Sequence, residues 1–166
     1  MDLISKREAR LLFRVTNFFN PQHILQVGAS TGVESVAIQD VSHTSHLSLY
    51  EPVLEQKALA ARVLRSLSDR VECYDDVHVA IDEFLEEGSD SRMALINIPI
   101  DETLLKRLLD AQCVLVLRNL YRDRAMSQLF DTCCDHMSLG QTYTNNKIAI
   151  LNPNPKLQRE DFLLWL

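Results

Sequence analysis

Residues 28–32 of this sequence, with the letters GASTG, are a candidate for a catalytic or ligand-binding turn. Read literally they form G-x-S-x-G, the pattern in which a hydrolase exposes a nucleophilic serine on a sharp turn between a strand and a helix. Such a serine needs an oxyanion hole from an earlier loop, and its acid and histidine follow it on later strands. Only one predicted helix precedes Ser30, and no histidine clearly follows a late strand. The sequence therefore does not favour a hydrolase.

A nucleotide-binding turn explains the same residues better. The first strand of a doubly wound sheet ends where the backbone approaches a ligand, and only glycine or a small residue leaves room there. Gly28, Ser30 and Gly32 supply that room. A carboxylate about twenty residues on, at the end of the next strand, would accept hydrogen bonds from ribose hydroxyls, and Glu51 has this position. An ordinary turn for the glycines and a solvated helix-start acid for Glu51 are the alternatives.

The helices and strands around this turn can be predicted from hydrophobic periodicity. Apolar runs interrupted by turn residues predict strands, and apolar residues at three- and four-residue steps predict helices. The predicted helices are 5–19, 33–38, 53–67, 77–86, 104–109 and 125–134, and the predicted strands are 24–27, 46–50, 71–74, 93–96, 113–117, 138–143 and 148–151.

This alternation predicts an α/β fold, a doubly wound, Rossmann-like sheet of about seven strands with helices on both faces. The sheet is mostly parallel and ends in an antiparallel hairpin around a turn at Asn145 and Asn146. We expect one domain over residues 1–166, with a leading amphipathic helix in 1–20, the sheet and its crossover helices in 23–152, and a tail in 153–166.

Composition limits the partners. The chain has 166 residues, 46% of them hydrophobic, and a formal net charge of -6, so it lacks the clustered basic residues that nucleic acid requires. Charges recur every few positions in the first 15 residues, which argues against a secretory signal and a membrane span. The four cysteines have no paired spacing. We expect a cytoplasmic protein that binds neither nucleic acid nor membrane.

Three motifs in order, ILQVGASTGVES, LSLYEP and VECYDD, resemble the class I S-adenosylmethionine-dependent methyltransferases, most closely their small-molecule O-methyltransferase-like branch. The resemblance covers nearly the whole chain. It implies that the glycine turn lines the methionine and ribose of the cofactor, that Glu51 binds the ribose hydroxyls, and that residues around Tyr74 lie near the adenine. The residues that it assigns to S-adenosylmethionine are Gln26, Gly28, Ala29, Ser30, Gly32, Glu51, Tyr74, Asp75 and Asn97.

Several positions depart from that family. Its members usually carry an acid two residues before the first glycine, where this chain has Gln26, which can hydrogen-bond but holds no charge. Metal-dependent O-methyltransferases have carboxylates at the ends of the fourth and fifth strands, where this chain has Asn97 and the pair Arg118 and Asn119. An arginine beside a divalent cation costs Coulomb energy, and asparagine is a weaker ligand for a hard cation than aspartate. We expect no metal site.

Methyl transfer can proceed without a metal, by holding the nucleophile in line with the methyl group, with or without a general base. Tyr121, Asp123 and His136 are candidates for that base, but a surface residue or helix cap explains each of them better, so the sequence assigns no catalytic residue.

The leading hypothesis is a metal-independent methyltransferase for an unidentified small-molecule acceptor. The alternative is a catalytically degenerate protein of the same fold that serves as a ligand-binding or interaction module, because several expected polar positions are altered together. A nicotinamide-dependent dehydrogenase is disfavoured, since GASTG lacks the G-x-G-x-x-G spacing. The sequence is compatible with a homo-oligomer and does not identify the acceptor.

Overall fold

The computed structural model of the chain divides it into two compact units, residues 1–93 and 94–166. The predicted single domain over residues 1–166 stays a prediction. The structure describes residues 4–41, 44–86, 88 and 91–164.

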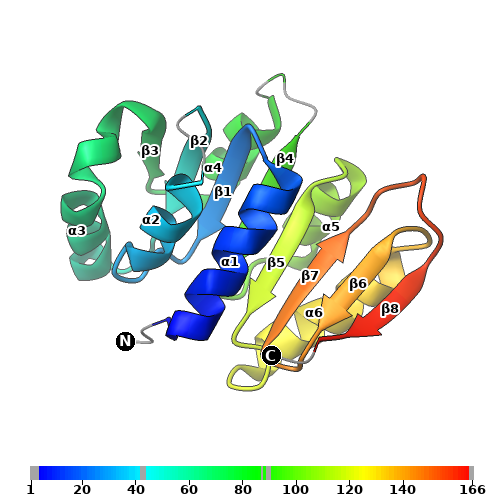
Figure 1. Cartoon of the computed structure of the whole chain (residues 1–166). Coiled ribbons are helices and arrows are strands. Elements are labelled where there is room, and N and C mark those ends of the chain that lie inside the picture. Colours follow the sequence, from blue (N-terminus) through cyan, green and yellow to red (C-terminus); the bar gives the residue numbers. More distant parts are fainter. Residues whose placement is uncertain (1–3, 42–43, 87, 89–90, 165–166) are drawn as a thin grey trace. The chain divides into compact units, whose positions relative to one another are not determined.

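The first unit alternates strands and helices from its beginning (Figure 1). Its elements are α1 (Lys6–Phe19), β1 (His23–Val27), α2 (Val33–Gln39), β2 (His46–Tyr50), α3 (Leu54–Val63), a 3-10 helix (Arg65–Arg70), β3 (Val71–Tyr74) and α4 (Val77–Glu86).

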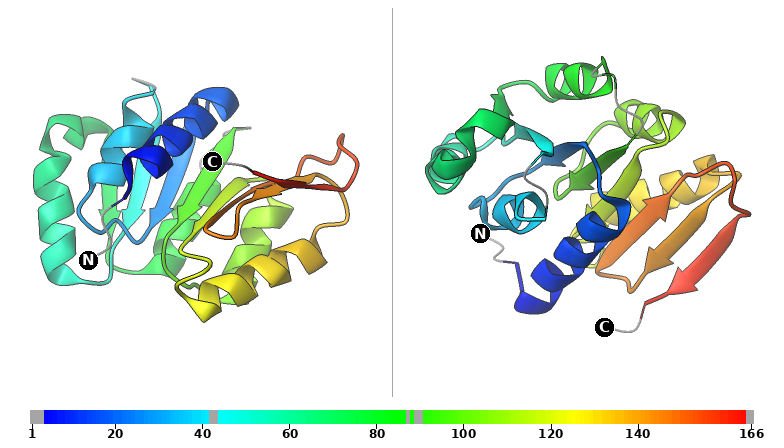
Figure 2. Two further views of the ribbon diagram at one scale, coloured as in Figure 1. Left: turned by 60° about the horizontal axis from the view of Figure 1, so that its bottom comes forward. Right: turned by 45° about the horizontal axis from the view of Figure 1, so that its top comes forward.

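Strands β1, β2 and β3 are parallel neighbours, with β2 in the middle. Helices α1 and α2 pack on each other on one face of these strands, and α4 packs on the other face (Figures 1 and 2). Both faces of β1 are thus covered, and Ile24, Leu25 and Val27 have no exposed surface. This is why Ile24, Leu25 and Val27 are all apolar, with Gln26 as the one polar residue among them.

The start of α1 shows why the first helix begins where it does. The hydroxyl of Ser5 accepts a hydrogen bond from the backbone N–H of Glu8 at 3.2 Å, and the Glu8 carboxylate accepts one from the backbone N–H of Ser5 at 3.1 Å. This reciprocal capping box satisfies two donors that the first helical turn otherwise leaves without partners.

Strand β4 (Arg92–Ile96) spans the boundary between the units, and the second unit then follows. Its further elements are α5 (Glu102–Asp110), β5 (Val114–Arg118), α6 (Arg124–His136), β6 (Gln141–Thr144), β7 (Ile148–Asn152) and β8 (Glu160–Leu163).

In the second unit, β7 pairs antiparallel with β5 on one side and with β6 on the other, so β6 and β7 form the predicted C-terminal hairpin. Helices α5 and α6 pack on each other and on β5, and they lie on the same face of these strands (Figure 2). All five residues of β5 are buried. The eight strands form the mostly parallel sheet with an antiparallel hairpin that the sequence predicts.

Three local predictions were wrong. The strand expected over residues 138–143 begins only at Gln141 and ends at Thr144. The helix expected over residues 53–67 ends at Val63, and a 3-10 helix continues from Arg65 to Arg70. The tail expected over residues 153–166 contains an additional strand, β8, which pairs parallel with β6. No described helix has the length and apolar character needed to cross a membrane.

Candidate functional site

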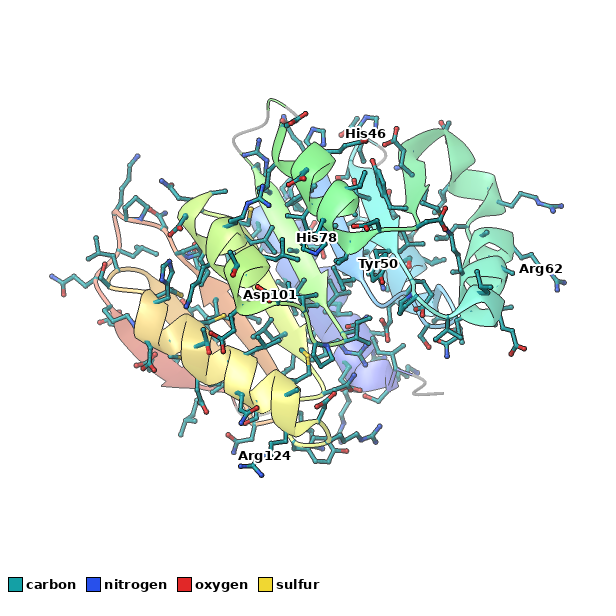
Figure 3. The ribbon with its side chains drawn as sticks, turned by 180° about the vertical axis from the view of Figure 1, so that it is seen from behind. His46, Tyr50, Arg62, His78, Asp101 and Arg124 are labelled. Atoms are coloured by element: carbon teal, nitrogen blue, oxygen red, sulfur yellow. The ribbon has the colours of Figure 1, made fainter. Side chains whose placement is uncertain are left out.

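Three of the predicted cofactor residues directly follow the ends of neighbouring strands. The last residues of β1, β2 and β3 are paired in register, so Gly28, Glu51 and Asp75 follow neighbouring strand ends. Figure 3 labels Tyr50, the residue directly before Glu51, and His46 at the other end of β2. The backbone N–H of Gly28 donates to the carbonyl of Tyr50 at 2.8 Å, which continues the pairing of β1 and β2 into the turn. In parallel sheets this edge is where ligands bind.

The turn after β1 has an unusual backbone. Gly28, Ser30 and Gly32 have φ angles of 84°, 50° and 79°, all in the region that favours glycine. Ser30 carries a side chain and adopts this conformation nevertheless, which costs free energy unless the surroundings hold it. The intervening Ala29 is fully buried. The turn is therefore a defined shape that something nearby must maintain.

Glu51 maintains it. One oxygen of the Glu51 carboxylate accepts the backbone N–H of Ser30 at 2.8 Å, and the other accepts the backbone N–H of Val53 at 3.0 Å. The side chain links the glycine turn to the start of the segment that enters α3, and the residue is only 6% exposed. A carboxylate offers about four acceptor positions, so two such bonds leave capacity for the hydroxyls of a ligand.

Gly32 has a packing role that the sequence did not reveal. A Cβ at this position would lie 3.0 Å from Cα of Ala60 and 3.3 Å from its Cβ, on helix α3. Gly32 also begins α2, as its N-cap residue. The close approach of two helices and the positive φ angle together explain why glycine is needed at this end of the turn.

Gln26 lies beneath the turn in a buried hydrogen-bond network. Its amide nitrogen donates to the carboxylate of Glu34 at 3.3 Å, and its carbonyl oxygen accepts from the hydroxyl of Ser35 at 2.6 Å. Gln26 and Ser35 are fully buried and Glu34 is 3% exposed. Glu34 lies in the first turn of α2, where the helix dipole favours a negative charge.

Glu34 is the residue that sequence reasoning missed. It places a carboxylate beside Gln26, the position where the resembling family carries an acid. In the sequence it looks like an ordinary acidic residue in the first turn of a helix. Its position directly after the glycine turn was the available signal.

The predicted adenine-side residues already have partners. The hydroxyl of Tyr74 lies 2.6 Å from the carboxylate of Glu72 and 2.9 Å from that of Glu83, and burial with these acidic neighbours raises the pKa of Tyr74. The carboxylate of Asp75 forms an ion pair with Lys57, whose ammonium also donates to the Tyr74 carbonyl. The Asp75 side chain is 91% exposed. Both residues follow or end β3, and their side chains are engaged within the first unit.

Asn97, the remaining predicted cofactor residue, belongs to the second unit. Its side-chain oxygen accepts from a guanidinium nitrogen of Arg118 at 3.3 Å, and its backbone carbonyl accepts from the side-chain amide of Asn119 at 3.0 Å. Asn97 is 7% exposed and Arg118 is 3% exposed. These three residues follow or end β4 and β5, at the positions that the sequence singled out. They place a buried guanidinium against an amide rather than a pair of carboxylates.

The three candidate bases have structural partners in the second unit. Asp123 is the N-cap of α6 and accepts from the backbone N–H of Ala125 at 2.9 Å. His136 lies 2.7 Å from the carboxylate of Asp110. Tyr121 is 58% exposed and its hydroxyl accepts from Arg122. Across the described residues, no three or more His, Cys, Asp or Glu side chains are grouped as a metal site.

Comparisons with known proteins bear on the fold. No protein-family model matches this chain, and no curated protein matches it. Solved structures do. A methyltransferase from Geobacter sulfurreducens is 19% identical with a TM-score of 0.71, and the match covers 90% of this chain and 79% of that one.

Two further structures are similar in the same way. A putative caffeoyl-CoA O-methyltransferase from Staphylococcus aureus is 14% identical with a TM-score of 0.68, covering 91% of this chain and 85% of that one. An O-methyltransferase from Bacillus cereus, in complex with S-adenosylhomocysteine, is 14% identical with a TM-score of 0.67, covering 90% and 82%. The chain therefore has the methyltransferase fold that its three motifs predicted.

Proposed function

We propose that this protein is an S-adenosylmethionine-dependent methyltransferase that acts on a small-molecule acceptor without a divalent metal. The observation that carries the proposal is the contact between Glu51 and Ser30. A carboxylate at the end of β2 holds the turn that follows β1, at the carboxyl edge of parallel strands. That the methyltransferase from Bacillus cereus was solved with S-adenosylhomocysteine supports this choice of ligand.

The residues at this edge of the sheet fit such a cofactor. Glu51 would accept hydrogen bonds from the two ribose hydroxyls with the acceptor positions that the backbone N–H groups leave. The turn from Gly28 to Gly32 would pass along the ribose and the methionine part. The cofactor supplies an activated methyl group on a sulfonium, so the protein needs chiefly to bind it and to orient the acceptor.

Glu34 extends the proposal to the ammonium group of the cofactor. A cation near Gln26 would meet the negative charge of Glu34 instead of a charge on β1, because the Gln26 amide already contacts that carboxylate. The loss of an acid at position 26 is thereby offset eight residues later. Tyr74 and Asp75 are proposed for the adenine side, where the partners of their side chains would have to shift or be shared.

Metal independence is part of the proposal and is supported by Arg118. Its guanidinium stays protonated at physiological pH and donates to the side-chain oxygen of Asn97. That oxygen is a weak ligand for a hard cation, and the arginine already occupies it. We expect the protein to act in the cytoplasm.

A thermal-shift comparison tests the function. Adding S-adenosylmethionine or S-adenosylhomocysteine at about a hundred times its Kd should raise the Tm by about 5 to 10 °C for a chain of this size, and NAD should leave it unchanged. A shift with NAD alone would indicate a dehydrogenase. No shift with any of the three would leave a scaffold that binds none of them and would overturn the proposal.

Paired variants locate the effect. Glu34→Gln removes the charge beside Gln26, so S-adenosylhomocysteine should raise the Tm of this variant less than it raises that of the wild type, each measured against its own ligand-free Tm. Glu55→Gln is the matched control, because Glu55 is also in the first turn of a helix but is exposed. Equal shifts in both variants would remove Glu34 from the site.

A further inference from the structure

A small pocket lies in the second unit, at the carboxyl ends of its helices α5 and α6. Its volume is about 190 Å³, and it is formed where α5 and α6 end, before β6 begins and after β7 ends. Asp101 and Arg124, labelled in Figure 3, mark the opposite, amino ends of α5 and α6. The pocket is lined by Leu109, Asp110, Gln112, His136, Met137, Ser138, Leu139, Pro153 and Pro155.

The charges around this pocket suit a cation while the His136 ring is neutral. Asp110 is the last residue of α5 and His136 is the last residue of α6, so two helix carboxyl ends, each with a partial negative charge, meet at one place. The ring Nε2 of His136 lies 2.7 Å from one carboxylate oxygen of Asp110. The Asp110 side chain is 69% exposed, so its carboxylate is accessible to a ligand.

Two more polar residues belong to the lining. Gln112, which has a positive φ of 58°, and Ser138 each carry a side-chain oxygen that can accept a hydrogen bond. The lining therefore holds acceptors besides the Asp110 carboxylate. This is the requirement of an ammonium group, which carries three donors and no acceptor.

More than half of the lining residues are apolar. They are two leucines, a methionine and two prolines, namely Leu109, Leu139, Met137, Pro153 and Pro155. The volume equals that of about six water molecules, which is room for a ligand of fragment size. A bare metal ion would make no use of these apolar residues, whereas a short aliphatic or aromatic group would bury its surface against them.

We propose that this pocket binds a small organic ammonium ion, with the charged nitrogen on the Asp110 carboxylate and its apolar group against the leucines and prolines. His136 orients the Asp110 carboxylate, because its ring nitrogen contacts one of the two carboxylate oxygens. The site lies at the amino end of β5, whereas Arg118 lies at the carboxyl end of that strand. It is a second site, and it does not depend on the proposed methyl transfer.

A titration followed by ¹H–¹⁵N NMR tests this, with benzylammonium as the probe and benzyl alcohol as its neutral counterpart of nearly the same shape. Benzylammonium should shift the amide signals of Gln112 and of residues 136–140 in a saturable manner within the millimolar range. Benzyl alcohol should bind at least about tenfold more weakly, because the hydrogen bond to a charged group is lost.

Variants distinguish a built site from general attraction to an acidic surface. Asp110→Asn should weaken benzylammonium binding at least about tenfold. Asp135→Asn is the matched control, because Asp135 is exposed near the end of the same helix as His136 and is not part of the lining. It should leave the affinity unchanged. Equal binding of amine and alcohol, equal losses in the two variants, or no saturation would each overturn the proposal.

Discussion

Removing the Glu51 carboxylate should destabilise the protein even when no ligand is present. The carboxylate accepts two backbone N–H groups, from Ser30 at 2.8 Å and from Val53 at 3.0 Å, and Glu51 is 6% exposed. Glu51→Ala leaves both N–H donors without this acceptor. Each lost acceptor should cost about 1–2 kcal/mol of folding free energy, because water reaches part of the turn and replaces some of the lost hydrogen bonding. The free energy of unfolding should therefore fall by about 2–4 kcal/mol, most of which is loss of support for a turn with three positive φ angles.

Urea unfolding followed by circular dichroism measures this change. Glu51→Gln keeps one carbonyl oxygen as an acceptor, so about half the loss is expected. Glu55→Ala is the control, since this exposed residue lies in the first turn of α3 and should change the free energy by no more than about 0.5 kcal/mol. A Glu51→Ala variant as stable as the Glu55→Ala control would show that the carboxylate does not hold the turn, and the reasoning about the site would fail with it.

Three further outcomes follow from the same structure. Gly32→Ala should lower the free energy of unfolding by about 1–3 kcal/mol, because its φ is 79° and the new Cβ would meet helix α3, whereas Gly88→Ala, with open space around it, should be nearly neutral in the same urea experiment. The pKa of His23 is lowered by burial and by the neighbouring His46 and Arg92, so protonation of His23 disfavours the folded state. The free energy of unfolding should be highest above pH 6.5, the ordinary pKa of histidine, and should fall as the pH drops below it. His23→Gln should flatten that dependence in unfolding measured at successive pH values. Added Mg²⁺ should neither raise the Tm nor increase methyl transfer, and activity that a chelator abolishes would contradict metal independence.

The strands of the fold could be predicted because their burial leaves a direct trace in the sequence. Strands β1, β4 and β5 have four or more buried residues each, so they read as short, mostly apolar runs that end near turn residues. The hairpin of β6 and β7 was found from its turn, where the Asn145 side chain accepts from two backbone N–H groups and Asn146 has a φ of 66°. These signals are local, which is why sequence reasoning could use them.

The strand β8 could not be predicted because none of its residues is buried. Its four residues, from Glu160 to Leu163, are all exposed, so no alternation of apolar and polar positions marks it. It is specified instead by its partner β6, through the stacking of Phe162 on Tyr143 with ring centroids 5.0 Å apart. A strand that depends on one long-range neighbour leaves little periodic pattern in its own sequence.

The candidate site was predictable in its positions and not in its contacts. The spacing of Gly28 and Glu51 placed both at one edge of the sheet, and the register of β1 with β2 brings them together. The link from Glu51 to the backbone of Ser30 and the carboxylate of Glu34 beside Gln26 depend on burial and side-chain direction. Neither property follows from spacing along the chain.

Calorimetric titration of S-adenosylhomocysteine is the decisive test of the proposed cofactor site, because it measures binding without requiring an acceptor. The proposed site predicts one ligand per chain, an affinity weakened about tenfold to a hundredfold by Glu51→Gln, and no change in Glu55→Gln. A wild-type protein that gives no heat at millimolar ligand would contradict the claim. So would equal affinities for wild type and Glu51→Gln, because the ligand would then be bound somewhere other than the turn that Glu51 holds.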